Sequence, residues 1–233
     1  MKNISTLFAL MLATSMSSQA ATISLSSTAP TVDGSDIAQL TSTTGLSGDN
    51  GDVWGNRPAM GQSFTTLSNP DGYSIDSFSF KSDTGGFSSN PSWGLPGDMQ
   101  YTFRIGTISG TTFSSLASGT SIPVGSYTAG DWFTMTFDSP VTLSANTEYA
   151  IDILHDNTPN FGGWRSAGTA SSVYAGGTSY ASGVQNAPLD DSNLTLHSFD
   201  RTFHVNLAAI PEPSSTALLG LGLSSMLLRR RRS

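Results

Sequence analysis

The stretch AGDWFTMTFDSPVTLSANTEYAIDIL, residues 129–154, decides the fold class of this chain. Large apolar side chains occupy every second position in each half of it: Phe133, Met135 and Phe137, then Tyr149, Ile151 and Ile153. This period of two is typical of a strand that places one face against a core. The Ser144-Ala145-Asn146 triplet between the halves is typical of a turn. We therefore expect two antiparallel strands here.

Four more stretches have the same pattern: GQSFTT (61–66), IDSFSFK (75–81), MQYTFRIG (99–106) and RTFHVNL (201–207). The alternation assigns Arg104, Asp152 and His204 to the polar faces of half-buried strands, and we expect His204 to face solvent. Turn signals such as Asn69-Pro70-Asp71-Gly72 separate the strands, and no part of 22–208 has a sustained helical period. The fold class predicted is all-β, an antiparallel β-sandwich of jelly-roll type.

The composition excludes several function classes. The 233 residues include no cysteine, so disulfides, thiolate metal sites and a cysteine nucleophile are ruled out. Residues 21–210 hold five basic and 16 acidic residues, a formal charge of −11. Phosphate contacts need clustered lysine or arginine, so we expect no nucleic-acid partner.

Both ends of the chain differ from the predicted sandwich domain, which spans 21–208. Residues 1–20 are a predicted signal peptide: a lysine, an apolar run and small residues before a cleavage point at Ala21. Residues 209–233 contain an apolar run, 214–228, that predicts a short C-terminal transmembrane helix. At about 1.5 Å per residue it is roughly 22 Å long, short of the roughly 30 Å hydrocarbon core. The terminal arginines favour a cytoplasmic end by the positive-inside rule, which leaves the body outside.

The tail carries a specific resemblance. The triplet Pro211, Glu212, Pro213, then the apolar run and then Arg229, Arg230, Arg231 and Arg232 resemble a PEP-CTERM sorting signal of Gram-negative bacteria. The resemblance covers about the last 24 residues. It implies recognition by an exosortase, a membrane-embedded cysteine transpeptidase, and cleavage near Pro-Glu-Pro. The implied route is export, transient anchoring in the inner membrane, and then the cell surface or the extracellular space. The alternative is an ordinary anchor that stays uncleaved.

A second resemblance covers roughly residues 60–154. The hairpin at 129–154, together with GQSFTT and IDSFSF before it, resembles the choice-of-anchor β-sandwich domains of bacterial surface proteins. Those domains occur with varied anchors, and the C-terminal sorting label is one of them. The resemblance implies a fold and a location but no reaction.

No catalytic residues are predicted. The three histidines, His155, His197 and His204, have no metal-ligand spacing, and the nucleophile elbow of the α/β-hydrolases is missing. His155 precedes Asp156, but at a strand end. Glu148 is the only glutamate of the body, and we expect it on a solvated outer face. A glycosidase pair among the 16 acidic residues stays open as an alternative.

Two kinds of ligand are candidates, and each has a structural alternative. Oxygen ligands suit calcium, and two loop clusters offer them: Asp49, Asn50 and Asp52, and then Asp190, Asp191 and Asn193. Such residues also form turns without any metal. Carbohydrate would stack on exposed indoles, and Trp54, Trp93 and Trp164 all lie in glycine-rich loops. The alternative is that these rings pack at the ends of the core. Trp132, on a strand, is expected to be structural.

These observations predict an exported cell-surface or extracellular-matrix protein that an exosortase processes. It is expected to be non-catalytic and to associate with exopolysaccharide, which hosts of this sorting system commonly make. The alternatives are a secreted polysaccharide-active hydrolase and a purely structural envelope protein. The hydrolase would need two carboxylates that face each other across a cleft.

Overall fold

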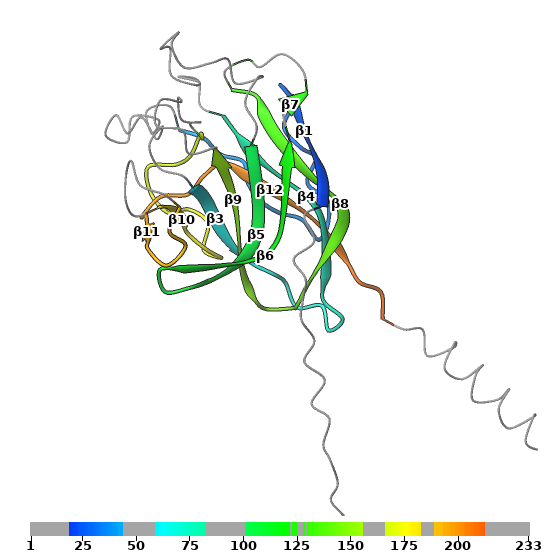
Figure 1. Ribbon diagram of the computed structural model, residues 1–233. Coiled ribbons are helices and arrows are strands. Elements are labelled where there is room, and N and C mark those ends of the chain that lie inside the picture. Colours follow the sequence, from blue (N-terminus) through cyan, green and yellow to red (C-terminus); the bar gives the residue numbers. More distant parts are fainter. Residues whose placement is uncertain are drawn as a thin grey trace, which may run out of the picture.

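The computed structural model describes residues 19–43, 59–82, 101–121, 123–124, 128, 130–155, 166–182 and 189–212. Within these ranges the regular structure consists of β-strands alone, with no helix, so the all-β prediction is confirmed. The strands form two sheets whose pairs are antiparallel except at β1 (Figure 1). The predicted hairpin corresponds to β8 (Trp132–Leu143) and β9 (Glu148–His155), but these two strands lie in different sheets. Their turn is thus a corner between sheets, and the expected pairing was wrong.

Six strands form sheet A, in the spatial order β11 (Leu194–Leu196), β10 (Ser179–Ser182), β3 (Ala59–Thr65), β9, β5 (Tyr101–Ser109) and β6 (Thr112–Ser121). Sheet B runs in the order β1 (Gln19–Ser26), β8, β4 (Tyr73–Lys81), β12 (Phe203–Ala209) and β2 (Ile37–Gln39). The two-residue strand β7 (Pro123–Val124) pairs with β1.

Strand β1 joins the two sheets. Gln19 and Ala20 pair in parallel with β6 of sheet A, and Ala21 to Ser26 pair antiparallel with β8 of sheet B. The expected cleavage point before Ala21 therefore lies inside β1, at the boundary between these two sets of pairs. Residues 1–18 of the predicted signal peptide lie outside the described residues.

The core lies between the sheets and is rich in aromatic rings. Phe103 of sheet A lies 5.9 Å from Phe78 and 5.3 Å from Phe137 of sheet B, measured between ring centroids. All six alternating residues of the opening stretch are buried in this core, as their spacing predicts. Trp132 is also buried, 3% exposed, so its expected structural role is confirmed.

The outer face of sheet A differs from the prediction that Arg104 and Asp152 lie on the polar faces of half-buried strands. Arg104 and Asp152 do point away from the core, but they are 5% and 0% exposed. These two side chains do not meet solvent, because Asp191, which lies just before β11, binds Arg104 on this face. Leu194 belongs to a second apolar cluster there, with Phe113, Ala150 and Tyr180. A period of two shows which residues share a face, and only the rest of the fold shows whether that face meets water.

His204 is a second correction, on sheet B. We expected it to face solvent, and it is 4% exposed. The turn before β2 packs against β12, and Oδ2 of Asp36 lies 3.0 Å from Nε2 of His204. The other carboxylate oxygen accepts a hydrogen bond from the Leu207 amide at 3.0 Å. Thr202, two residues before His204, is buried as well, and its hydroxyl donates to the carbonyl of Thr41.

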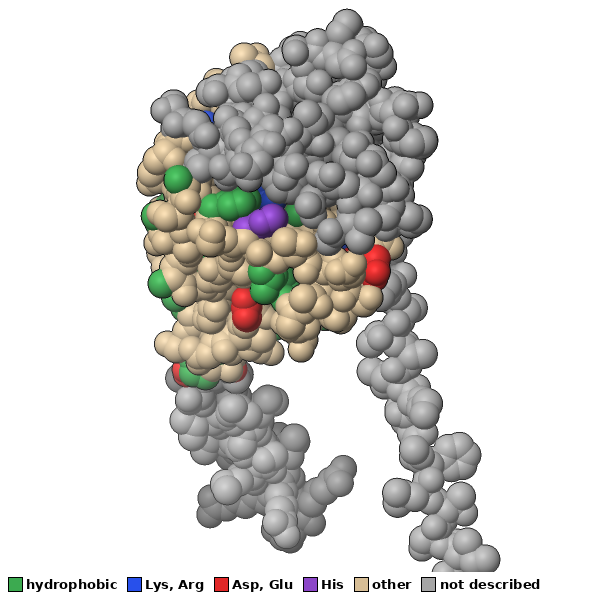
Figure 2. All heavy atoms as spheres, turned by 90° about the vertical axis from the view of Figure 1, so that its left-hand side faces the viewer, with side chains coloured by type: hydrophobic (Ala, Val, Ile, Leu, Met, Phe, Trp, Pro, Cys, Tyr) green, Lys and Arg blue, Asp and Glu red, His purple; other side chains and the backbone are tan. Residues whose placement is uncertain are grey.

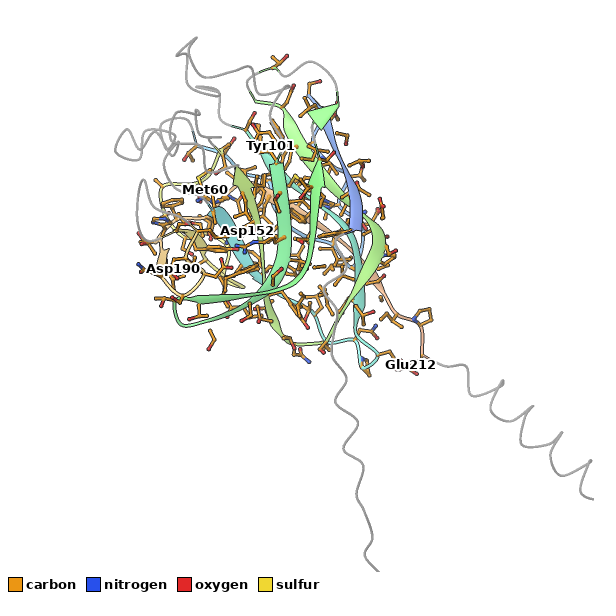
Figure 3. The ribbon with its side chains drawn as sticks, in the orientation of Figure 1. Met60, Tyr101, Asp152, Asp190 and Glu212 are labelled. Carbon is orange, nitrogen blue, oxygen red and sulfur yellow. The ribbon has the colours of Figure 1, made fainter. Side chains whose placement is uncertain are left out.

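The strand directions give the sandwich two distinct ends. Tyr73 at the start of β4 pairs with Ala209 at the end of β12, and Thr65 at the end of β3 pairs with Glu148. We call this the exit end, because the chain leaves the sandwich there. Tyr101 marks the opposite end, where it pairs with His155. Figure 3 shows Tyr101 and Glu212 at opposite ends of the molecule.

Candidate functional site

The last residues of β12 are held by the turn that connects β3 and β4. After Ala209 pairs with Tyr73, the Ile210 amide donates to the Gly72 carbonyl at 3.1 Å. The side-chain amide of Asn69 donates to the Ile210 carbonyl at 3.0 Å and also to the carbonyl of Gly72. We call Asn69, Gly72 and Ile210 the exit clasp.

The turn sequence explains why the clasp forms. Asn69-Pro70-Asp71-Gly72 has the residue order favoured in tight turns, with asparagine first, proline second and glycine fourth. The turn is closed by a hydrogen bond of 2.8 Å from the Gly72 amide to the Asn69 carbonyl. Gly72 has φ +82°, and a Cβ there would lie 2.3 Å from the Leu143 carbonyl oxygen. Glycine is therefore required at this position.

Pro211 and Glu212 follow the clasp directly and are both exposed. Figure 3 shows Glu212 beyond the body of the sandwich, past the end of β12. Pro213 and Arg229 to Arg232 lie outside the described residues, as does the predicted helix at 214–228. Across the part of the chain that is described, no helix has the length and apolarity needed to span a bilayer. The structure therefore places the first two residues of the Pro-Glu-Pro triplet on the surface, next to the last residue that the fold holds.

Residues 209–232 match the model of the PEP-CTERM protein-sorting motif. The chain carries a PEP-CTERM sorting signal. The match confirms the resemblance of the tail and supports an exported surface protein that an exosortase processes. It begins at Ala209, so the first two residues of the PEP-CTERM match, Ala209 and Ile210, belong to the folded domain.

Two further comparisons concern the whole chain. No curated protein matches it. A structure of the cysteine protease and lectin-like domains of Cwp84, a surface layer associated protein of Clostridium difficile, is 14% identical with a TM-score of 0.38. That match covers 66% of this chain and 33% of the other. A second structure of clostridial Cwp84, after propeptide cleavage, is 12% identical with the same TM-score and covers 66% and 37%. A likeness this weak supports no statement about fold or activity.

A buried ion-pair cluster occupies the outer face of sheet A. Nε and Nη2 of Arg104 donate to the two carboxylate oxygens of Asp152, at 3.0 and 2.7 Å. Nη1 and Nη2 donate to the two oxygens of Asp191, at 2.8 and 2.9 Å. The ring of Phe113 lies 4.2 Å from the guanidinium carbon, at cation–π distance. Arg104 is thus bound by two bidentate carboxylates.

The electrostatics of this cluster favour a charged, structural arginine. Burial on its own lowers the pKa of Arg104, but the two carboxylates outweigh it and hold that pKa well above its ordinary value. Burial raises the pKa of Asp152, and the ion pair with Arg104 opposes the rise. Each guanidinium edge is already paired, so the cluster joins the Asp191 segment to sheet A rather than presenting a free charge.

Asp200 and Arg201 fasten another part of the chain. The carboxylate of Asp200 is fully buried and accepts hydrogen bonds from the amides of Val173 and Tyr174, at 2.6 and 2.7 Å. Its other oxygen accepts from the Gln62 side chain at 3.1 Å. The buried aspartate therefore ties the segment before β10 to β3.

The Arg201 guanidinium donates to backbone carbonyls of two adjacent strands. Nε donates to Gly61 at 2.9 Å and Nη2 to Tyr180 at 3.1 Å, and Nη1 donates to the Ser166 hydroxyl. Burial lowers the pKa of Arg201 to about 10, so the group remains protonated at neutral pH. The buried cation thus connects β3 and β10 to the segment just before β12.

The two candidate calcium clusters have different outcomes. Asp49, Asn50 and Asp52 lie outside the described residues. In the second cluster, Asp190 accepts hydrogen bonds from the amide and hydroxyl of Ser192, and Asp191 is bound to Arg104. The Asn193 amide donates to the Asp190 carbonyl, which closes a turn. The described residues contain no group of three or more His, Cys, Asp or Glu side chains placed to hold a metal ion.

The candidate carbohydrate-binding residues, Trp54, Trp93 and Trp164, lie outside the described residues. Their segments are flanked by described residues at the end of the sandwich opposite the exit, such as Ala59, Tyr101 and His155. Asp156, the neighbour of His155, is not described, and Glu148 is exposed as expected.

Large apolar side chains that are exposed are spread over several elements: Val32, Leu40, Leu67, Leu116, Val173, Leu189 and Leu196. Figure 2, which views the molecule from the left-hand side of Figure 1, shows the described apolar side chains in small separate groups on that face. The described surface in this view therefore presents no extended apolar patch.

Neither the clasp nor the ion-pair cluster was predicted from the sequence. Asn69 and Ile210 are 141 residues apart, and Arg104 is 87 residues from Asp191. The Asn-Pro-Asp-Gly signal indicates a turn but not its partner. One hint of the cluster was present in the sequence, a charged residue near the middle of each of two strands, Arg104 in β5 and Asp152 in β9.

Proposed function

We propose that this protein is a non-catalytic component of the cell surface or extracellular matrix, released or transferred there by an exosortase and associated with exopolysaccharide. The observation that carries the proposal is the position of the sorting motif. It begins on the last strand of a folded domain and continues into the exposed Pro211 and Glu212. Pro211 and Glu212 are therefore open to a processing enzyme at the surface of the domain.

The state of the charged side chains supports a non-catalytic role. Arg104, Asp152, Asp200 and Arg201 are all buried, and each is hydrogen-bonded to other parts of the fold. A general acid or base must reach a substrate proton, and a fully buried carboxylate bound to an arginine does not. In the described part of the domain these groups stabilise loops.

The two ends of the sandwich support an exposed ligand face. The sorting tail leaves at the exit end, so a tail held at the membrane turns the opposite end outward. That is where the segments with Trp54, Trp93 and Trp164 begin and end, and we propose these tryptophans as the exopolysaccharide contacts. We also propose that the sandwich is of jelly-roll type, that it is a choice-of-anchor domain, and that residues 214–228 form a short membrane helix.

The decisive experiment is mass spectrometry of the C-terminus in a host with its exosortase and in a strain without it. We expect the exported protein to lack Arg229 to Arg232 in the first and to retain them, membrane-bound, in the second. The same C-terminus in both strains would refute processing by that enzyme.

The carbohydrate partner needs a separate test on the secreted protein. We expect pull-down by purified host exopolysaccharide to fall in Trp93→Ala and Trp164→Ala. Leu116→Ala, which also removes an exposed apolar side chain, is the matched control. Binding unchanged in both tryptophan variants would count against this partner but not against sorting.

A further inference from the structure

The folded domain and the sorting tail meet without a spacer. Ile210 is the last residue of the clasp, where Asn69 and Gly72 bind it, and the triplet begins at the next residue, Pro211. The apolar run begins at Ser214, so three residues separate it from the clasp. Three extended residues span at most about 10 Å. An enzyme at the membrane surface must therefore act within about 10 Å of the body of the sandwich.

This spacing conflicts with the way enzymes bind peptide substrates. A cleft that takes an extended chain needs residues on both sides of the bond that it cuts. On the N-terminal side of the triplet the available residues are Ala208, Ala209 and Ile210, which belong to the sheet or the clasp. Their backbone groups are paired with Ser74, Tyr73 and Gly72.

The last three residues before the triplet, Ala208 to Ile210, are held to the sheet more weakly than the rest of β12. Ala208 and Ala209 are exposed, and Ile210 is only half-buried, so little apolar surface holds them. Leu207, by contrast, is buried, and its amide donates to Oδ1 of Asp36. If β12 separates from the sheet starting at Ile210, Leu207 is therefore the first residue whose buried side chain and amide hydrogen bond resist the separation.

We propose that Asn69 is a positioning residue for tail processing: it holds Ile210 in the clasp, and release of Ala208 to Ile210 provides the chain length that the exosortase needs. This inference rests on the proposed exosortase processing. Release lengthens the accessible tail by three residues, roughly 10 Å, and Leu207 keeps the domain folded. The clasp thereby sets the rate of cleavage without contacting the reacting bond.

The test compares four forms of the full chain in a host with its exosortase, by pulse–chase and mass spectrometry of the C-terminus. Asn69→Ala removes the side-chain hydrogen bond to Ile210, and should raise the released population and the processing rate about three- to tenfold. Insertion of Gly-Ser-Gly between Ile210 and Pro211 supplies the length directly and should speed processing by at least as much. Asn69→Ala should add nothing to the insertion. Asn206→Ala, an exposed asparagine on the same strand, is the control and should process like the wild type.

Two measurements separate positioning from a general loss of stability. Hydrogen exchange at the Ile210 amide should rise about three- to tenfold in Asn69→Ala, and exchange at the Leu207 amide should not change. Equal processing rates for the wild type, Asn69→Ala and the insertion would overturn the inference while exosortase processing stands. A wild-type tail that is never processed would overturn the proposed function and this inference together. The insertion does not alter the clasp, so it tests the length requirement even if Asn69→Ala folds poorly.

Discussion

Replacing Asp152 with alanine should destabilise the protein much more than replacing Asp191, although both carboxylates bind the same guanidinium. The Asp152 side chain is fully buried, whereas that of Asp191 is 35% exposed. In Asp152→Ala, two donors of Arg104 lose their acceptors in a place that water does not reach. In Asp191→Ala, water can replace the lost carboxylate.

The magnitudes follow from these exposures. Removal of one partner from a buried pair costs about 3–5 kcal/mol, and we expect about 3 kcal/mol for Asp152→Ala because Asp191 still binds one edge of the guanidinium. For Asp191→Ala we expect about 1 kcal/mol. In a domain of this size each kcal/mol lowers the melting temperature by about 2–4 °C, which gives falls of roughly 6–12 °C and 2–4 °C.

The assay is thermal and urea unfolding of the purified protein, followed by circular dichroism. Asp138→Ala, which removes an exposed carboxylate on β8, is the control and should shift the midpoint by less than about 1 °C. Equal losses for Asp152→Ala and Asp191→Ala would refute the reasoning, because burial would then not decide the cost of an unpaired donor. A larger loss for Asp191→Ala would refute it as well.

Three further outcomes are expected. Gly61→Ala should lower the free energy of unfolding in urea by at least about 2 kcal/mol, because its Cβ would lie 2.3 Å from a carbonyl oxygen and from a tyrosine ring. The control is Gly34→Ala, where the Cβ meets open space, and its free energy of unfolding should change by no more than about 0.5 kcal/mol. Asp36→Ala should lower the free energy of unfolding by about 2 kcal/mol in the same assay, since its carboxylate accepts from a buried histidine and two backbone amides. Asp33→Ala, which removes an exposed carboxylate, is the control. Similar losses for the two variants would show that these hydrogen bonds do not stabilise the fold. Any shift of the melting temperature on adding a chelator should be the same in the wild type and in Asp191→Ala, because both oxygens of Asp191 accept from an arginine. A shift that is lost in Asp191→Ala would show that this aspartate binds a metal.

The tail shows which kind of functional site a sequence can reveal. The triplet, the apolar run and the arginines are consecutive, so their order and spacing are visible without a fold. The clasp that holds Ile210 is not visible in this way, because Asn69 reaches it only after β4 and β12 have paired. The ion-pair cluster likewise depends on the pairing of Arg104 with Asp152 across β5 and β9.

The sequence by itself determined six of the described strands, with their inward residues, and the sorting label; these strands are β3, β4, β5, β8, β9 and β12. It did not predict β1, β2, β6, β7, β10 or β11. The features that it determined are local properties: alternation every second residue, turn residues between strands, and a contiguous motif. Only the tertiary structure decided the environment of the second face of each strand. Arg104, Asp152 and His204 alternate as polar residues should, yet other segments of the chain cover them, Asp191 over Arg104 and the earlier Asp36 over His204. The physical reason is that alternation records which side of a sheet a residue occupies, whereas burial depends on what the rest of the chain places over that side.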